Sequence, residues 1–293
     1  DSYRRDFTIN SLYYCPLSKK IVGHEDGMKH IHEKKVVSIG DPKKRFAEDP
    51  VRCLRALRFS NKLNFKIDPK IKDAIYEKGH LLSGISNARI FDEFCKIFLN
   101  GMAEKNYRKM TSFGLNKYLV TTNPEKNEFT SRLIIEALRN TDKRLKNNQS
   151  VTPGFLIAAL LWPELLEKSI AKGEINLRKF FRSMDQVLRK QQKITAIPRK
   201  FHSYIKDIWV LQLKLHSRIG RQPYKTLKHP RFRAAYDFML IREKAANEVN
   251  NLGKWWTKFQ RNDDNLKKSL IKIINENDTQ ESFKTFGFSQ ELR

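Results

Sequence analysis

The spacing of hydrophobic residues changes once along the chain. In residues 1–47, two runs rich in aromatic and β-branched residues, FTINSLYY at 7–14 and KVVSIG at 35–40, predict short β-strands joined by turns. A lone hairpin of this length is not stable in water, so we expect both strands to dock on other parts of a fold. From about residue 48 the apolar residues recur at the helical spacing instead, and this period continues through most of the chain.

The helical windows begin with EDPVRCLRALRFSNKL, from residue 48. Its acidic residues and Pro50 fall in the expected first turn, and Val51, Leu54 and Leu57 share one face. Clusters of Gly, Pro, Asn and Ser separate the later windows. These windows lie at about 69–78, 88–99, 103–112, 129–140, 153–169, 176–192, 200–217, 231–249 and 264–275. The pattern therefore predicts a mostly α fold that begins with a few short strands.

Two turn-rich segments mark candidate domain boundaries, TTNPEKN at 121–127 and KNNQSVTPG at 146–154. The last thirty residues are polar and are expected to fray. The resulting division has four parts, at 1–47, 48–125, 126–262 and 263–293.

Charge narrows the choice of partner. The 293 residues include 58 Lys and Arg against 32 Asp and Glu, a formal net charge of +26. Such an excess attracts phosphate polymers by releasing their condensed counterions, so RNA or DNA is the expected partner. An anionic membrane surface would also attract it, but surface-binding proteins concentrate their basic residues on one amphipathic helix. Here the basic residues run through the whole chain.

The longest apolar runs, such as Phe155 to Trp162, are far shorter than the roughly 20 residues that span a bilayer. The three cysteines, Cys15, Cys53 and Cys95, form no close pair and are odd in number. We therefore expect a cytoplasmic protein with no membrane insertion.

Candidate chemistry first occurs at Arg4, Arg5 and Asp6, directly before the first predicted strand. A carboxylate here can accept a hydrogen bond from a ribose hydroxyl or help to hold Mg²⁺, and guanidinium forks bind phosphate oxygens. Neighbouring Arg and Asp residues are also common on solvated surfaces, and the tripeptide alone favours that interpretation.

The second candidate is GDPKKRFAEDPVRCLRALRF at 40–59. Asp49 and Arg52 are three residues apart at a predicted helix start, so they can present an acceptor and a donor side by side. Adenine and cytosine both offer the complementary pattern of an amine beside a ring nitrogen, whereas guanine and uracil reverse it. The alternative is an i,i+3 salt bridge that stabilises the helix N-terminus, and for a generic sequence it is favoured.

The two motifs together resemble those of a known superfamily. RRDFTINSLYY, followed after about 25 residues by GDPKKRFAEDPVRCLRALRFSNKL, is similar to the class II nucleotidyltransferases, which include bacterial poly(A) polymerases and CCA-adding enzymes. SNARIFDEFCKIF resembles the neck segment of that superfamily. FLIAALLW, AIPRKFHSYIKDIWVLQL, HPRFRAAYDFMLIREKA and KWWTKFQ resemble the body of the poly(A) polymerase branch.

The resemblance implies a remnant of an α+β nucleotidyltransferase head at 1–47, followed by an all-helical neck and body. It also implies transfer of AMP from ATP to RNA 3′ ends without a template, with Mg²⁺ or Mn²⁺ as cofactor; protein partners are not indicated. Asp6 would act as catalytic residue and metal ligand, Arg5 would lie beside the nucleotide, and Asp49 and Arg52 would read the base. The residues placed near the triphosphate or the RNA end are Arg45, Arg55 and Arg58.

The principal metal ligands of the superfamily, an Asp-x-Asp pair after a Gly-Gly segment, have no match here. Because two-metal chemistry needs several converging carboxylates, we expect this chain to be the C-terminal part of the enzyme and inactive alone. Two alternatives remain: a CCA-adding enzyme, because the base-reading pair serves both bases, and a non-catalytic helical RNA-binding protein.

Basic and aromatic residues of the body are candidates for RNA contact. In HPRFRAAYDFMLIRE, Phe232, Ala235, Phe238 or Met239, and Leu240 are expected to form one packed face while the arginines face solvent or RNA. Trp255, between Lys254 and Trp256, either stacks on bases or lies in the core. The predicted RNA-binding set is Arg231, Arg233, Arg242, Lys254 and Trp255.

Overall fold

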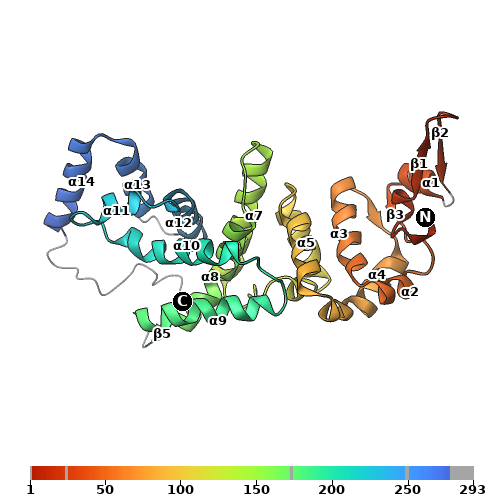
Figure 1. The fold of residues 1–293 in the computed structure, drawn as a ribbon, viewed down its shortest axis with the longest axis horizontal. Coiled ribbons are helices and arrows are strands. Elements are labelled where there is room, and N and C mark those ends of the chain that lie inside the picture. The colour runs from red at the N-terminus through yellow and green to blue at the C-terminus, as the bar shows by residue number, and fades with distance from the viewer. Residues whose placement is uncertain (1, 24–25, 172–173, 248–250, 278–293) are drawn as a thin grey trace. The chain divides into compact units, whose positions relative to one another are not determined.

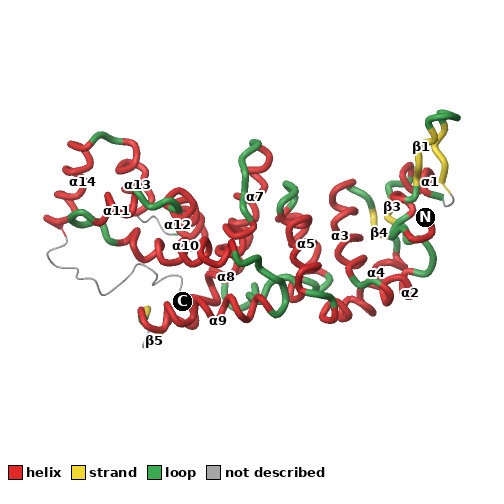
Figure 2. The backbone as a smooth tube through the Cα atoms, viewed as in Figure 1, coloured by secondary structure: helices red, strands yellow, loops and turns green. Residues whose placement is uncertain are grey.

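The computed structural model describes residues 2–23, 26–171, 174–247 and 251–277, and the chain divides into two compact units (Figure 1). Unit 1 comprises Asp1–Val120 and Lys193–Ala196, and unit 2 comprises Thr121–Gln192 and Ile197–Arg293. Helices dominate both units and the strands are short (Figure 2), which confirms the predicted fold class. The expected boundaries at 47 and 262 fall inside the units, so the division into four parts stays a prediction.

Unit 1 combines short strand pairs with six helices among its described residues. The strands β1 and β2 form an antiparallel hairpin, and β3 pairs with β4 in parallel. Short 3-10 turns lie at Ser2–Arg4, Thr8–Asn10, Gly79–Gly84 and Asn116–Tyr118. The elements are β1 Leu12–Cys15, β2 Lys20–Gly23, α1 Gly27–His32, β3 Lys35–Val36, α2 Pro42–Glu48, α3 Val51–Leu63, β4 Lys66–Ile67, α4 Pro69–Lys78, α5 Asn87–Phe98 and α6 Ala103–Ser112.

The strand predicted at 7–14 is partly wrong. Its first half forms the 3-10 turn Thr8–Asn10, because Asp6 Oδ1 accepts hydrogen bonds from Phe7 N and Asn10 Nδ2, at 2.9 Å each. Such local side-chain bonds compete with strand pairing. The segment read as a connecting turn instead supplies β2 and α1, and the strand predicted at 35–40 shortens to β3.

The helix predicted from residue 48 begins slightly later, as α3 at Val51, and the pattern missed the preceding helix α2; Asp49 lies between the two helices in an extended conformation. The cause is Pro50, since a proline forces the preceding residue out of the helical region. Asp49 Oδ1 accepts a hydrogen bond from Val51 N at 3.3 Å and so caps the start of α3. The predicted apolar face of α3 is confirmed: Val51, Leu54 and Leu57 are buried.

Unit 2 is built around α8, whose side chains are almost all buried against α7, α9 and α10. No helix in the described part of the chain is long and apolar enough to cross a membrane. The elements are α7 Glu128–Lys146, α8 Pro153–Ser169, β5 Ile170–Ala171, β6 Glu174–Ile175, α9 Leu177–Gln192, α10 Lys200–His216, α11 Gln222–Leu227, α12 Phe232–Ala246, α13 Asn251–Arg261 and α14 Asp264–Asn277.

Two helices of unit 2, α11 and α13, were missed by the hydrophobic pattern. The helix predicted at 231–249 ends at Ala246 because Asn247 adopts the left-handed conformation that terminates helices. Residues 248–250 of that prediction lie outside the described residues. Within the tail expected to fray, α14 is helical, and 278–293 lie outside the described residues.

Candidate functional site

An open pocket of about 620 Å³ lies in unit 1 and contains five of the predicted nucleotide-site residues. Six basic and four acidic side chains line it, so the pocket is net positive. The lining residues are Arg4, Arg5, Asp6, Asn10, Asp49, Arg52, Arg55, Phe59, Arg89, Asp92, Glu93 and Lys96. This charge suits an anionic ligand.

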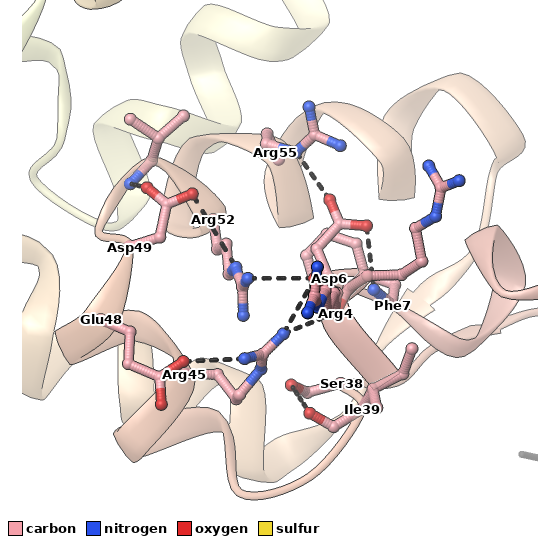
Figure 3. Close-up of polar contacts among 12 residues, drawn as sticks. Arg4, Asp6, Phe7, Ser38, Ile39, Arg45, Glu48, Asp49, Arg52 and Arg55 are labelled. Atoms are coloured by element: carbon pink, nitrogen blue, oxygen red, sulfur yellow. Dashed lines mark hydrogen bonds and ion pairs between the residues drawn. The ribbon is translucent and has the colours of Figure 1, made fainter. Parts of the chain in front are cut away.

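Asp6 is held rigidly at one side of this pocket (Figure 3). A β-bridge between Phe7 and Ser38 fixes the backbone. The carboxylate is only 6% exposed: Oδ1 accepts from Phe7 N and Asn10 Nδ2, and Oδ2 accepts from Arg55 Nε at 2.6 Å. Both oxygens are therefore already bonded, and Asp6 sets the position of the Arg55 guanidinium.

The described residues do not fit the metal site that the resemblance implies. Two-metal catalysis requires several converging carboxylates. Across the described ranges, no three His, Cys, Asp or Glu side chains are close enough together to hold a metal ion. The single expected ligand, Asp6, is engaged with Arg55. Neither Mg²⁺ nor Mn²⁺ is therefore assigned to residues of this chain.

Of the base-reading pair, Asp49 lies away from Asp6, whereas Arg52 lies between them and its Nη2 donates to the Arg4 carbonyl oxygen at 3.5 Å (Figure 3). Asp49 Oδ2 is 3.9 Å from Arg52 Nε, a loose ion pair, but accepts a 2.6 Å hydrogen bond from Arg89 Nη2. Burial lowers the pKa of Arg52, as does the nearby Arg45, while Asp49 acts in the opposite direction. Arg52 Nη1 is buried without a hydrogen-bond partner among the described residues, which leaves one donor for a ligand.

Arg45 and Arg58, which were expected near the triphosphate or the RNA end, do not line the pocket. Arg45 Nη2 donates to the carbonyl oxygens of Arg5 at 2.8 Å and Arg4 at 3.1 Å, and its Nη1 pairs with Glu48 at 2.7 Å (Figure 3). It holds the Arg-Arg-Asp segment against α2. Arg58 lies over the ring of its neighbour Phe59, with 4.4 Å between guanidinium carbon and ring centroid.

The pocket also contains residues that sequence reasoning missed. Arg89, Asp92, Glu93 and Lys96 project from α5, and Arg89 directly restrains the predicted base reader Asp49. The only local signal was the SNARIFDEF string with its charged residues at helical spacing. Nothing in the sequence indicates that α5 lies beside the start of α3.

The predicted RNA-binding residues of the body divide into two groups. Arg231, Arg233 and Lys254 are exposed, as expected. Arg242 is buried, and its Nη1 donates to Gln212 Oε1 at 2.9 Å. The expectation that Arg242 faces solvent or RNA is therefore wrong, because its guanidinium lies between α10 and α12.

Trp255 is also buried, at 7% exposure, so its predicted stacking on bases is wrong for this structure. Its ring stacks on Phe259, with 4.7 Å between centroids, because the apolar face of α13 turns towards the core. The neighbouring Trp256 is fully buried. On α12, Leu240 departs from the predicted packed face and is 37% exposed.

Three family models match consecutive parts of the chain. Residues 1–37 match "Poly A polymerase head domain", and residues 64–128 match "Probable RNA and SrmB- binding site of polymerase A". Residues 172–285 match "Polymerase A arginine-rich C-terminus". The pocket draws on the first two matched segments and on Asp49, Arg52, Arg55 and Phe59, which lie between them.

Comparison of the chain with curated proteins gives relatives of the same kind. The chain is 35% identical over 287 residues to poly(A) polymerase I of Salmonella typhi, covering 94% of this chain and 62% of that protein. It is 36% identical over 281 residues to poly(A) polymerase I of Haemophilus influenzae, covering 92% and 62%. A CCA-adding enzyme of Lactococcus lactis is 28% identical over 252 residues, covering 86% and 57%.

Among solved structures, a tRNA-processing enzyme with CTP superposes with a TM-score of 0.62 at 19% identity, covering 94% of this chain and 74% of that chain. The Thermotoga maritima CCA-adding enzyme complexed with tRNA gives a TM-score of 0.58 at 17% identity, covering 94% and 73%. At these identities the likeness shows a shared fold.

In its fold and in its two motifs the chain resembles the class II nucleotidyltransferases. Within that superfamily, its sequence matches poly(A) polymerase family models and curated poly(A) polymerases over most of its length. It spans 62% of the length of the poly(A) polymerase relatives that it matches.

Proposed function

We propose that the protein is a polynucleotide adenylyltransferase, which adds AMP from ATP to RNA 3′ ends without a nucleic-acid template. This chain supplies the part that selects the base and holds the RNA. The observation that carries the proposal is the single pocket that Asp49 and Arg52 line together with Arg5, Asp6 and Arg55. A base reader and a set of phosphate-binding groups thus line one cavity.

Asp49 accepts from the exocyclic amine of adenine, and Arg52 donates to the adjacent ring nitrogen. Arg89 and the start of α3 hold the Asp49 carboxylate in place, so little side-chain freedom is lost when a base arrives. The unpartnered Nη1 of Arg52 supports this assignment, because a buried donor without a partner is costly until a ligand satisfies it.

The phosphates lie against the guanidinium groups of Arg5 and Arg55. Asp6 keeps Arg55 oriented through the 2.6 Å hydrogen bond and acts as a positioning residue. Arg45 acts one step further away, because it fixes the backbone carbonyls of Arg4 and Arg5.

RNA as the acceptor is supported by the net charge of +26 and by the exposed cations of unit 2. Relatives of the same fold were solved with tRNA and with CTP. A poly(A) polymerase I matches 94% of the chain at 35% identity, against 86% at 28% for a CCA-adding enzyme, which favours ATP and a growing tail over CCA addition.

The test uses the full-length protein, a short labelled RNA primer and each nucleoside triphosphate separately. ATP alone should extend the primer into a ladder. Asp49→Ala and Arg52→Ala should each reduce the preference for ATP over UTP by about 5- to 150-fold, since one good bidentate base contact contributes about 1–3 kcal/mol. RNA affinity should change little, because neither side chain binds the primer backbone.

Two results would overturn the proposal. Addition that stops after a single A, or that requires CTP first, would assign the CCA reaction instead. Salt-sensitive RNA binding without incorporation of any nucleotide by the full-length protein would indicate a non-catalytic RNA-binding protein.

A further inference from the structure

A second basic cavity lies in unit 2, in a groove of about 360 Å³ between α7 and α12. It is separate from the nucleotide pocket, and only one of its residues, Arg233, belongs to the predicted RNA-binding set. Five basic and two acidic side chains line it. The lining residues are Glu136, Arg139, Asn140, Lys143, Arg144, Asn147, Gln149, Arg233, Asp237, Leu240, Ile241 and Lys244.

The two acids each join two cations from different helices. Glu136 pairs with Arg139 at 3.0 Å and with Lys244 at 2.6 Å. Asp237 pairs with Arg144 and with Arg233, both at 3.1 Å. Each cluster thus joins two cations to one acid.

Lys143 adds a further cation to this groove. It is exposed and forms no ion pair with any residue in the described part of the chain. Arg233 and Lys244 are about 70% exposed despite their acidic partners, so their charges remain accessible to a ligand. The groove therefore presents several accessible cations above two partly buried acids.

The spacing of the clusters indicates an extended ligand. Because Glu136 pairs with Lys244 and Arg144 pairs with Asp237, α7 and α12 run antiparallel along the groove. The eight residues from 136 to 144 place the clusters about 12 Å apart along α7. Leu240, exposed and apolar, lies between the positions that form the two clusters on α12. A single phosphate would fill one cluster, whereas a polyanion reaches both.

We propose that the α7–α12 groove binds the sugar-phosphate backbone of single-stranded RNA upstream of its 3′ end. The proposal rests on the proposed function for the identity of the polymer. The cations of the groove replace the counterions of successive phosphates, and Leu240 contacts a sugar or base face between them.

The test measures binding of a fluorescent single-stranded RNA of about 16 nucleotides to the 293-residue chain by anisotropy, over a series of salt concentrations. The test variant is Lys143→Ala with Arg233→Ala. The matched control is Lys168→Ala with Arg178→Ala, two exposed cations at the adjoining ends of α8 and α9. The ion pair Lys126–Glu167 places that end of α8 beside the start of α7, about 25 Å along α7 from Lys143.

Each phosphate contact on a single strand contributes a slope of about −0.7 in log affinity against log salt, which amounts to about fourfold in affinity at 0.15 M. The groove variant should therefore bind about 15-fold more weakly, with a slope about 1.4 less negative. The control should bind as the unmodified chain does. Far-UV circular dichroism should be the same for all three proteins.

Equal losses in the groove variant and the control would overturn the proposal, since the effect would then follow net charge alone. Unchanged affinity and slope in the groove variant would also overturn it. So would displacement of the RNA by polyglutamate at the same charge concentration, because that result would indicate an acidic protein as the ligand.

Primer extension by the full-length protein keeps the two proposals apart. Normal ATP addition with unchanged RNA binding in the groove variant would refute the groove and leave the proposed function standing. Suppose instead that the full-length protein transfers no nucleotide and that the groove variant loses RNA binding. The proposed adenylyltransferase function would then be refuted, and RNA binding by the groove would be supported.

Discussion

The pair formed by Asp6 and Arg55 allows a sharp test of what Asp6 does. The carboxylate is buried and bonded on both oxygens, while the Arg55 side chain is 31% exposed. A hydrogen bond between charged groups contributes about 1.5–3 kcal/mol, and partial exposure of Arg55 reduces this to about 1–2 kcal/mol. Asp6→Asn should therefore destabilise unit 1 by about 2 kcal/mol, with about 1–2 kcal/mol of coupling in the double variant Asp6→Asn/Arg55→Gln.

Urea unfolding followed by two signals measures this effect. All four tryptophans, at 162, 209, 255 and 256, lie in unit 2, so their fluorescence reports on that unit alone. Asp6→Asn should move the transition seen by circular dichroism for unit 1 and leave the fluorescence transition in place. A carboxylate kept only as a metal ligand gains no stability from its neighbours, and its removal is neutral or stabilising. Unchanged or increased stability in Asp6→Asn, or a coupling energy near zero, would refute the positioning role.

Three further predictions concern other residues. Arg45→Lys should impair ATP addition by the full-length protein as severely as Arg45→Ala, because a lysine ammonium cannot donate to two backbone carbonyls as the guanidinium does. Near-normal activity of the lysine variant would instead indicate that Arg45 binds a phosphate directly. Burial, reinforced by Arg242, lowers the pKa of His216 to about 3, so the folded state keeps it neutral while the unfolded state protonates near pH 6.5. The contribution of neutral His216 to the free energy of unfolding is complete above pH 6.5 and is lost as the pH falls towards 3. His216→Gln should therefore make the urea midpoint depend less on pH between 7.5 and 4.5. An unchanged pH dependence would contradict this. Trp255→Ala should cost about 3–5 kcal/mol of stability, whereas Trp255→Phe should keep RNA affinity within about twofold; a large loss of affinity in a folded Trp255→Phe protein would indicate base stacking.

Local signals in the sequence account for most helix positions. The helices α4, α6 and α8 begin and end where the apolar period predicts, and α4 and α8 each start at a capping residue followed by proline. The same signal, Asp41 before Pro42, marks the start of α2, which the apolar period alone missed. Such caps depend only on neighbouring residues, so they are readable before any tertiary contact is known.

The predictions that were wrong concern residues whose exposure depends on how the helices pack. Trp255 carries the same flanking lysines as an RNA-stacking residue would, but the apolar face of α13 buries it. Arg242 lies in a segment rich in basic residues, which predicts exposure, but packing of α12 on α10 places its guanidinium beside Gln212. Residue type indicates what a side chain can bind, whereas burial decides whether it is accessible.

The mostly helical class, the basic character and the two motifs that point to nucleotidyl transfer can be read from the order of residues alone. The packing of the helices was needed to see that Asp49 is held by Arg89, that Asp6 is bonded to Arg55, and that cations of α7 and α12 share one groove. These pairs join residues 40, 49 and about 100 positions apart. Helical period and charge are properties of neighbouring residues, whereas such contacts depend on how helices distant in the sequence pack.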